Sequence, residues 1–223
     1  MPKNLYMEKI GKKAKLASLN LSNVNIEKRN SVLKQFSQYL RSNSQSILNS
    51  NKKDIYNAKS KKIKDSMIDR LKLNNKKIAQ IRNSIEKIIK FKDPIGKTLS
   101  SWKRPNGLII KRVSIPIGVI GVIYESRPNV TSDVSALCFK TGNVVILRGG
   151  SEAFHSNKIL AKLFKKALKK KKCDENCVQF IENKDRSLVD YLLSNMKNYI
   201  DVIIPRGGKG LVKKVLKKST ISI

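Results

Sequence analysis

Short apolar runs and longer amphipathic segments alternate through the second half of the chain. The apolar runs predict buried strands at about residues 117–124, 144–148, 177–181 and 199–204. The segments that follow them have a helical period and predict helices at about residues 131–141, 152–171, 186–196 and 208–218. Strands that alternate with helices of this length are typical of a parallel sheet covered on both faces. We therefore predict an α/β fold.

The first 92 residues have a different pattern, which is polar and helical. From Ile26 onward the apolar positions recur at helical spacing, and Asn25 before them is a suitable N-cap. A second helix is predicted over residues 76–91, before a break that contains a proline and a glycine. Residues 107–114 alternate weakly between apolar and polar positions, which favours one strand of a hairpin or arm.

These patterns divide the chain into three parts. We predict a helical segment (residues 1–106) that packs on the sheet, an arm (residues 107–116) and a sheet-containing domain (residues 117–223). The final residues, 221–223, look like the first part of a further strand. The fold is therefore expected to be incomplete at its C-terminus.

Basic residues greatly outnumber acidic ones. The chain has 48 Lys and Arg against 16 Asp and Glu, a formal net charge of +32. This charge fits nucleic-acid binding, binding of anionic metabolites, or a genome rich in A and T codons, which encode Lys, Asn and Ile together. The lysines are spread along the chain, and the aromatic residues (6%) do not interleave with them, which disfavours nucleic-acid binding. We interpret the charge mainly as genome composition, with a contribution from an anionic ligand.

Neither the cysteines nor the apolar runs indicate an exported or membrane protein. Three cysteines do not make a disulfide framework, and the Cys173–Cys177 pair lacks the further ligands of a metal site. The first twenty residues lack the apolar region of a signal peptide. The longest apolar run, residues 115–124, is about half of what a bilayer span needs. We expect a cytoplasmic protein with no metal and no membrane partner.

Charged and flexible residues follow three of the predicted strands. Because the carboxyl ends of parallel strands share one edge, where α/β proteins bind ligands, we expect these residues to form a site. Glycines let backbone amides approach a phosphate, and the following helix adds partial positive charge. The residues are Glu125, Arg127 and Asn129 after the first strand, Arg148, Gly149, Gly150 and Ser151 after the second, and Arg206, Gly207, Gly208 and Lys209 after the fourth.

Each of these turns also has an ordinary structural interpretation. Asn129 could donate a hydrogen bond to an oxyanion or cap the next helix. Arg127 could bind a carboxylate or acyl phosphate or pair with Glu125. Arg148 could bind a ligand or be merely solvated, and Ser151 could cap a helix. The spacing of the last turn is neither G-x-G-x-x-G nor a Walker loop, so an ordinary βα turn is an equal alternative.

Cys138 lies in an apolar helical stretch, where a free cysteine commonly serves as a small core residue. The chain's only histidine, His155, lies at the first turn of the next predicted helix. A catalytic pair of Cys138 and His155 is the less favoured alternative.

Two segments resemble the gamma-glutamyl phosphate reductase family of the aldehyde dehydrogenase superfamily. They are residues 115–151, which contain IYESRPNVTSDVSALCFKTGNVVILRGG, and residues 201–223, DVIIPRGGKGLVKKVLKKSTISI. The resemblance implies a Rossmann-like NADP-binding domain with helices on both faces of its sheet. It also implies the family's reaction, the NADPH-dependent reduction of L-glutamyl 5-phosphate to L-glutamate 5-semialdehyde and phosphate, the second step of proline synthesis from glutamate.

The resemblance also implies roles for the predicted turns. The adenosine side of NADP(H) would be flanked by Arg148, Gly149, Gly150 and Ser151, and its pyrophosphate would be lined by Arg206, Gly207 and Gly208. The substrate would face Glu125, Arg127 and Asn129. In the family a cysteine thiolate forms a thioester that accepts the hydride, and Asn129 could donate a hydrogen bond to the thioester oxyanion.

The resemblance covers the first half of the family's sequence. The family's nucleophilic cysteine lies in a catalytic domain after the strand that begins at Thr220, whereas this chain ends at Ile223. We therefore expect no catalytic cysteine in this chain, a complementary C-terminal half as a partner, and a homo-oligomer for the full-length enzyme. The alternatives are a non-catalytic cofactor-binding fragment and, less favoured, a basic nucleic-acid-binding protein.

Overall fold

A four-stranded parallel sheet forms the centre of the protein. The structure, a computed structural model, describes residues 3–223; residues 1 and 2 of the predicted helical segment lie outside the described residues. The strand order is β5–β4–β3–β6. The strands are β3 (Val119–Tyr124), β4 (Val144–Gly149), β5 (Val178–Phe180) and β6 (Val202–Arg206). The predicted α/β fold with a parallel sheet is confirmed.

Strands β3 and β4 are the middle of this sheet. All of their residues are buried, as expected for a parallel sheet with both faces covered. Tyr124 at the end of β3 pairs with Gly149 of β4 on one side and with Arg206 of β6 on the other. The three strands therefore end level with one another. The turns that follow them meet at one edge, called here the carboxyl edge.

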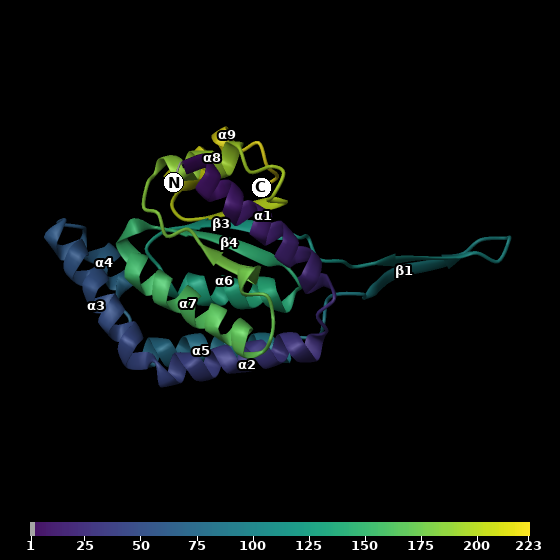
Figure 1. Ribbon diagram of the computed structural model, residues 1–223, viewed down its shortest axis with the longest axis horizontal. Coiled ribbons are helices and arrows are strands. Elements are labelled where there is room, and N and C mark those ends of the chain that lie inside the picture. The colour runs from purple at the N-terminus through teal and green to yellow at the C-terminus, as the bar shows by residue number, and fades with distance from the viewer. Residues whose placement is uncertain (1–2) are drawn as a thin grey trace.

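Helices cover both faces of the sheet (Figure 1). One face carries α6 (Pro128–Lys140) and α7 (Phe154–Lys170), and the other carries α1 (Lys3–Ser22), α8 (Ser187–Ser194) and α9 (Lys209–Lys218). Helices α2 (Ile26–Ser42) and α5 (Asn75–Lys90) form an outer layer over α6 and α7. The ring centroids of Phe36 in α2 and Phe164 in α7 are 4.6 Å apart. This contact belongs to a single core that the N-terminal helices share with the sheet.

Helices α3 (Ser44–Ser60) and α4 (Asp65–Leu71) lie beside the carboxyl edge. A small second core, made of Ala58, Ile68, Leu71 and Ala153, holds them against the 3₁₀ turn Ser151–Ala153 that follows β4. Part of the N-terminal helical segment is thus fixed next to the turns that the sequence identified as a candidate site.

Local sequence signals account for the limits of the N-terminal helices. Asn25 caps α2 as predicted, since its side chain accepts a hydrogen bond from the Lys28 backbone N–H at 2.9 Å. Asn74 caps α5 in the same way, with the Lys77 N–H at 2.8 Å. The predicted apolar face of α5 is buried at Ile78, Ile81, Ile85 and Ile88.

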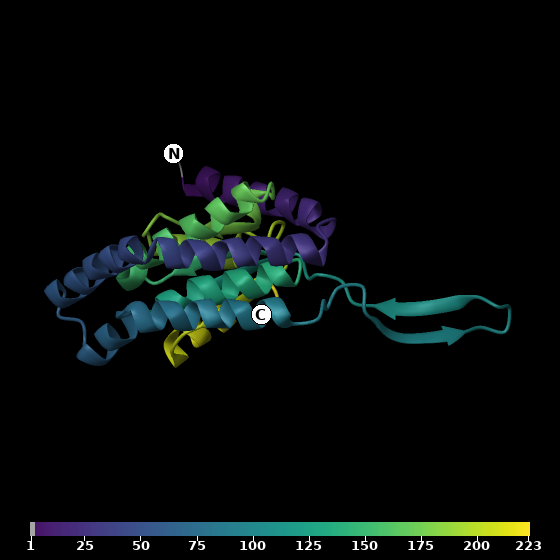
Figure 2. The ribbon, with the colours of Figure 1, turned by 90° about the horizontal axis from the view of Figure 1, so that it is seen from below.

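The arm is longer than predicted. Strands β1 (Thr98–Lys103) and β2 (Ile109–Val113) form an antiparallel hairpin that projects from the body (Figures 1 and 2). The predicted arm, residues 107–116, contains only the second strand, and β1 lies in the part of the predicted helical segment (residues 1–106) that follows its last helix. That helix, α5, ends at Lys90, close to the predicted end at residue 91. Every residue of β1 is exposed, so no core imposes an alternating pattern that would reveal the strand.

Two other boundaries differ from the predicted ones. Helix α6 begins at Pro128 instead of residue 131, because proline is favourable in the first turn of a helix. Strand β6 begins at Val202 instead of residue 199, because the preceding residues form a turn in which the Ile200 N–H bonds the Met196 carbonyl at 2.9 Å. Beyond β6, the Ser222 carbonyl accepts a hydrogen bond from the backbone N–H of Ile203 at 2.8 Å.

Candidate functional site

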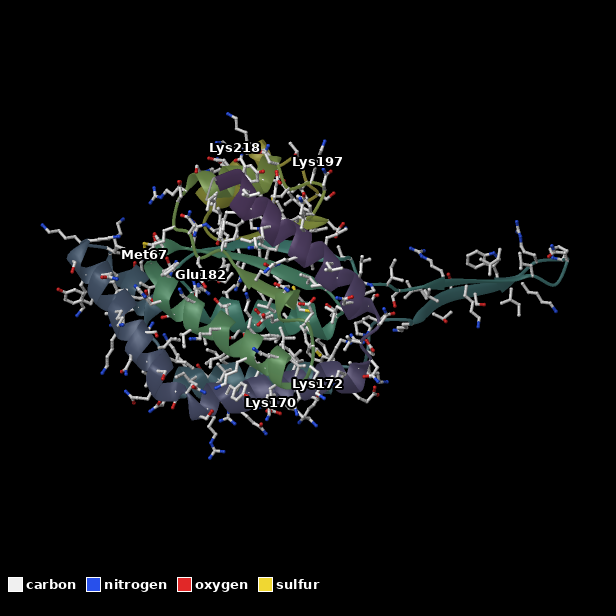
Figure 3. The ribbon with its side chains drawn as sticks, viewed as in Figure 1. Met67, Lys170, Lys172, Glu182, Lys197 and Lys218 are labelled. Atoms are coloured by element: carbon white, nitrogen blue, oxygen red, sulfur yellow. The ribbon has the colours of Figure 1, made fainter. Side chains whose placement is uncertain are left out.

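Three arginines and a glutamate line a cavity of about 380 Å³ at the carboxyl edge. Glu125 and Arg127 come from the turn after β3, Arg206 ends β6, and Arg70 belongs to α4. Met67 of α4 shares the lining and lies at the end of the molecule away from the arm (Figure 3). An excess of positive charge in a concave site suits an anionic ligand.

The Glu125 carboxylate lies over the glycine-rich turn between β6 and α9. Its Oε2 accepts a hydrogen bond from the Gly208 backbone N–H at 2.8 Å. Gly208 is the N-cap residue of α9, so the carboxylate sits at the partly positive end of that helix. A Cβ on Gly207 would come within 2.6 Å of the same oxygen. The predicted phosphate-type turn therefore does hold an oxyanion, which in this structure is a carboxylate of the chain itself.

Arg127 does not pair with Glu125. Among the described residues no ion pair joins the two side chains, so the ordinary structural role considered for Arg127 is wrong. Arg127 is exposed and lines the cavity. Its guanidinium group can therefore meet an anion that enters the cavity.

Ser126 is a buried and strained residue in the same lining. Its φ is +31°, in a region that residues with a side chain seldom adopt, and only 4% of its surface is exposed. Its Oγ has no hydrogen-bond partner among the described residues. A buried polar atom without a partner costs about 1–3 kcal/mol, which a ligand in the cavity would offset. Ser126 could not be singled out as a site residue from its pattern, because a serine in a turn is common.

Asn129 lies inside α6 and not before it. The helix begins at Pro128 with Arg127 in the N-cap position, so the alternative role of Asn129 as a cap is wrong. Its Nδ2 donates a hydrogen bond to Asp133 Oδ2 at 3.0 Å. Burial raises the pKa of the Asp133 carboxyl, against smaller lowering effects of the Asn129 hydrogen bond and the Arg206 charge. Asp133 therefore fixes the orientation of the Asn129 amide.

Arg148 positions a loop. It is only 5% exposed, and its guanidinium donates hydrogen bonds to the carbonyl oxygens of Gly149, Lys184 and Asp185 at 2.9, 3.1 and 3.3 Å. These bonds attach the loop between β5 and α8 to the end of β4. The interpretation of Arg148 as merely solvated is wrong, and its direct contact with a cofactor stays a prediction.

The glycines after β4 have different surroundings. A Cβ on Gly149 would lie 2.3 Å from Asn157 Nδ2 and 3.0 Å from the Tyr124 hydroxyl, both packed beneath the sheet edge. A Cβ on Gly150 would mainly meet the end of the flexible Glu152 side chain, at 2.4 Å. Packing therefore requires Gly149, whereas Gly150 keeps the surface of the turn open. Both glycines line a second cavity, of about 160 Å³, next to the first.

Ser151 does not cap α7. It begins the 3₁₀ turn and its side chain is exposed. The cap comes instead from Asp54 of α3, whose buried carboxylate accepts hydrogen bonds from the backbone N–H groups of His155 (3.0 Å) and Ser156 (2.7 Å). Sequence reasoning missed this contact because Asp54 precedes His155 by 101 residues, and no local motif links them.

The cysteines are poorly suited to nucleophilic attack. Cys138 is buried in α6, and burial raises the pKa of its thiol to about 12. Burial also raises the pKa of Cys173 and, more strongly, that of Cys177. His155 packs against the Phe154 ring and lines a separate cavity beside α3. Within residues 3–223 no hydrogen bond joins His155 to Cys138, so the structure does not show the proposed pair.

The described part of the chain contains no group of three or more His, Cys, Asp or Glu side chains placed to hold a metal ion. None of the described helices is both long enough and apolar enough to cross a bilayer.

The sequence as a whole matches known proteins along its length. A model of the aldehyde dehydrogenase family matches residues 4–222. The chain belongs to the aldehyde dehydrogenase family. This confirms the superfamily that the segments at residues 115–151 and 201–223 predicted.

Curated relatives indicate which enzymes of this family the chain resembles. The chain is 44% identical to the gamma-glutamyl phosphate reductase of Carboxydothermus hydrogenoformans over 214 residues. It is 45% identical to that of Clostridium perfringens, also over 214 residues. Each match covers 96% of this chain and 51% of the relative. The chain thus spans about half the length of the curated relatives it matches.

Solved structures of this family agree with the sequence comparison. The crystal structure of gamma-glutamyl phosphate reductase from Thermotoga maritima has a TM-score of 0.93 at 41% identity, covering 96% of this chain and 51% of that one. The structure from Saccharomyces cerevisiae has a TM-score of 0.89 at 31% identity, with 96% and 54% covered. A propionaldehyde dehydrogenase from Clostridium phytofermentans, at 16% identity and a TM-score of 0.72, shares the fold.

Proposed function

We propose that this chain forms the cofactor-binding half of a cytoplasmic gamma-glutamyl phosphate reductase, which reduces L-glutamyl 5-phosphate to L-glutamate 5-semialdehyde and phosphate with NADPH. The observation that carries the proposal is the oxyanion held by the Gly208 N–H at the start of α9, in a chain of the aldehyde dehydrogenase family. A turn that binds a carboxylate oxygen at a helix N-terminus also suits the oxygens of a pyrophosphate.

The residues at the carboxyl edge fit a phosphorylated dinucleotide. Gly207 has no side chain between the turn and the cavity, the Gly208 amide could exchange the Glu125 carboxylate for a phosphate, and Arg206 adds a forked donor beside them. The unpaired Ser126 hydroxyl supplies a further donor in the same cavity. The neighbouring turn at Gly150 would take the adenosine side. The bound cofactor would supply the hydride, and the chain's own residues would bind and orient it.

The substrate end of the site is proposed to lie at the turn after β3. Arg127 and Arg70 both line the cavity there, and either guanidinium can bind a carboxylate or an acyl phosphate through paired hydrogen bonds. Asn129, oriented by Asp133, has a second amide hydrogen that can donate to an oxyanion. The Glu125 carboxylate would have to give up its hydrogen bond with the Gly208 N–H when a phosphate binds there.

The nucleophilic thiol of the reaction is proposed to come from outside this chain. The thiolate, not the thiol, is the nucleophile, and the raised pKa of Cys138, about 12, keeps that thiol protonated at neutral pH. A complementary C-terminal segment would supply the reactive cysteine. The complete enzyme would be a homo-oligomer, a proposal supported by the exposed apolar side chains of the arm, which include Leu99, Trp102 and Ile109.

Turnover by the purified chain tests this proposal. The assay follows phosphate-dependent reduction of NADP⁺ in the presence of glutamate 5-semialdehyde. We expect no rate above background from the chain alone, and activity when the C-terminal half of a curated relative is added. Robust turnover without that half would contradict the proposal and would make Cys138→Ser the next variant to assay.

A second candidate function is a cofactor-binding module without catalysis. The raised pKa values of all three cysteine thiols favour it. Binding of NADPH without turnover, even after addition of the complementary half, would select this function over the reductase.

A further inference from the structure

The arm projects from the body on two short connectors. It consists of β1 and β2, residues 98–113, and the connectors are residues 91–97, after α5, and residues 114–118, before β3. Every residue of β1 is exposed, and in β2 only Ile110 is half-buried. The arm nevertheless extends along the long axis of the molecule (Figures 1 and 2). Because its strands have so little cover, the contacts of the connectors determine its direction.

A buried arginine of α2 holds the first connector. The Arg29 side chain is only 3% exposed, and its Nη2 donates a hydrogen bond to Asp93 Oδ2 at 2.6 Å. The other oxygen of this carboxylate, Asp93 Oδ1, accepts a hydrogen bond from the Ile95 backbone N–H at 3.1 Å. One carboxylate thus joins the body to the backbone that leads into the arm.

Arg29 is itself fixed by the body. Its Nε donates a hydrogen bond to the Val24 carbonyl at 3.1 Å, and its Nη1 donates one to the Lys140 carbonyl at the end of α6. Each nitrogen of the guanidinium therefore has an acceptor. Because the guanidinium is a planar and rigid fork, three acceptors in three directions fix its orientation. Asp93 thus binds a donor that cannot turn.

The turn between α6 and β4 contacts both connectors. A Cβ on Gly142 would lie 2.6 Å from Ile95 Cδ1 in the first connector and 2.9 Å from Pro116 Cγ in the second. The neighbouring Asn143 Oδ1 accepts a hydrogen bond from the Gly118 N–H at 2.9 Å. The turn therefore holds the two connectors at a fixed separation.

The two connectors are also bonded to each other at the root of the arm. The Ser114 carbonyl accepts the Gly96 N–H at 2.8 Å, and the Ser114 N–H donates to the Lys97 carbonyl at 3.0 Å. The Ser114 Oγ accepts the Lys97 N–H at 3.1 Å. These bonds close the hairpin at its root, so the arm can change direction only as one piece.

We propose that Arg29, Asp93 and the α6–β4 turn form an anchor that fixes the direction of the arm before the chain meets a second copy of itself. A buried ion pair adds little net stability, because desolvation offsets its attraction, but it can specify one arrangement over others. An arm with a fixed direction loses less conformational entropy on assembly than an arm that swings. The assembly role rests on the proposed function, in which the complete enzyme is a homo-oligomer, whereas the anchor concerns the free chain.

The only tryptophan of the sequence, Trp102, lies in β1 and reports the motion of the arm. Its fluorescence anisotropy decay is measured at a concentration at which the chain is a monomer. Asp93→Asn has one acceptor oxygen, whereas the donors of Arg29 and Ile95 contact different oxygens of Asp93. The variant therefore loses one of the two contacts. We expect the amplitude of the fast segmental decay to grow about twofold or more, on the nanosecond scale of loop motion.

Glu182→Gln is a matched control for Asp93→Asn. Glu182 also pairs with a cation at 2.6 Å, the Lys158 ammonium, and it lies on the body away from the arm (Figure 3). Both variants exchange a paired carboxylate for an amide. Only Asp93→Asn is expected to change the anisotropy decay of Trp102.

A pair of glycine variants tests the α6–β4 turn separately. Gly142 and Gly96 have nearly the same left-handed backbone, with φ of +73° and +72°. A Cβ on Gly142 would overlap both connectors, whereas a Cβ on Gly96 would meet nothing within 4 Å. Because alanine strains both backbones equally, the difference between the variants reports the contact with the connectors. The fast decay should therefore grow more in Gly142→Ala than in Gly96→Ala.

Sedimentation equilibrium measures the consequence for assembly. Asp93→Asn is expected to weaken self-association about threefold or more, and Glu182→Gln is expected to change it less than about twofold. Circular dichroism confirms that each variant retains the fold before the comparison.

The outcomes separate the anchor from the proposed function. An unchanged decay in Asp93→Asn, an equal change in Glu182→Gln, or a dominant fast decay already in the unaltered chain would overturn the anchor. Equal decays in Gly142→Ala and Gly96→Ala would remove the α6–β4 turn from it. An unaltered chain that stays monomeric at every concentration would overturn the assembly role alone. An unaltered chain that fails to bind NADPH would overturn the proposed function and leave the anchor standing.

Discussion

At the scale of single residues, Glu125 shows how the chain satisfies a helix N-terminus that a ligand is proposed to use. Its carboxylate accepts the Gly208 N–H at 2.8 Å, and this contact stabilises the start of α9. A phosphate would compete for the same amide. Glu125 therefore stabilises the free turn and opposes the binding of an anion there.

Glu125→Gln is expected to tighten NADPH binding and to lower the stability of the free chain. The variant loses a negative charge that contributes about 0.3–1 kcal/mol at a helix N-terminus, so the Kd should fall roughly two- to fivefold. Titration calorimetry and urea denaturation measure the two effects. Glu175→Gln removes the same charge from an exposed turn before β5 and serves as the control. Weaker NADPH binding by Glu125→Gln would rule out competition between the carboxylate and the cofactor.

Gly149→Ala is expected to destabilise the protein by about 1–3 kcal/mol, because its Cβ would overlap the packed Asn157 amide. Gly150→Ala should change stability by less than about 0.5 kcal/mol, since its φ of −59° is ordinary and its neighbour Glu152 is flexible. Urea denaturation of both variants gives the comparison. Equal stability of the two variants would contradict the packing role assigned to Gly149.

At the scale of secondary structure elements, the contact between α3 and α7 joins the helical segment to the sheet domain. The buried Asp54 carboxylate of α3 accepts hydrogen bonds from two backbone N–H groups at the start of α7, those of His155 and Ser156. Helix N-termini require such acceptors when they are buried. The α3–α4 loop with its lysines is therefore tied to the candidate site through this cap.

Asp54→Ala is expected to lower the free energy of unfolding by about 2 kcal/mol, the upper part of the range for losing an N-cap. Asn25→Ala removes an exposed cap of α2 and should cost about 1 kcal/mol or less. Urea denaturation measures both variants, and amide exchange at His155 and Ser156 should accelerate only in Asp54→Ala. An Asp54→Ala variant as stable as the unaltered chain would refute the capping role.

The same elements show which features the sequence reveals. The strands that carry the turns were predictable because continuous apolar runs mark buried strands, and glycines with charges mark their ends. Strand β1 was not predictable, since none of its residues is buried. The contributions of Asp54 and Arg70 to the carboxyl edge were also hidden, because they depend on contacts between segments far apart in the chain. The spacing of apolar residues reports only which positions of each segment are buried, and not which distant segment covers them.

At the scale of the whole molecule, the candidate site and the arm lie at opposite ends of the body (Figure 1). The site consists of three adjoining cavities at the carboxyl edge, with volumes of about 380, 160 and 480 Å³. Arginines, lysines and glycines are among the residues that line them. The basic residues that give the net charge of +32 are spread along the whole chain, so net charge alone does not identify the site. The arginines and lysines that line these cavities do identify it.

Hydrogen–deuterium exchange with and without NADPH tests the central claim most directly. The account predicts slower amide exchange on NADPH binding at residues 125–127, 149–151 and 206–209, and unchanged exchange in the arm at residues 98–113. Protection at these three turns would place the cofactor along the carboxyl edge. No protection there, or equal protection of the arm, would contradict the claim that this chain binds the cofactor at that edge.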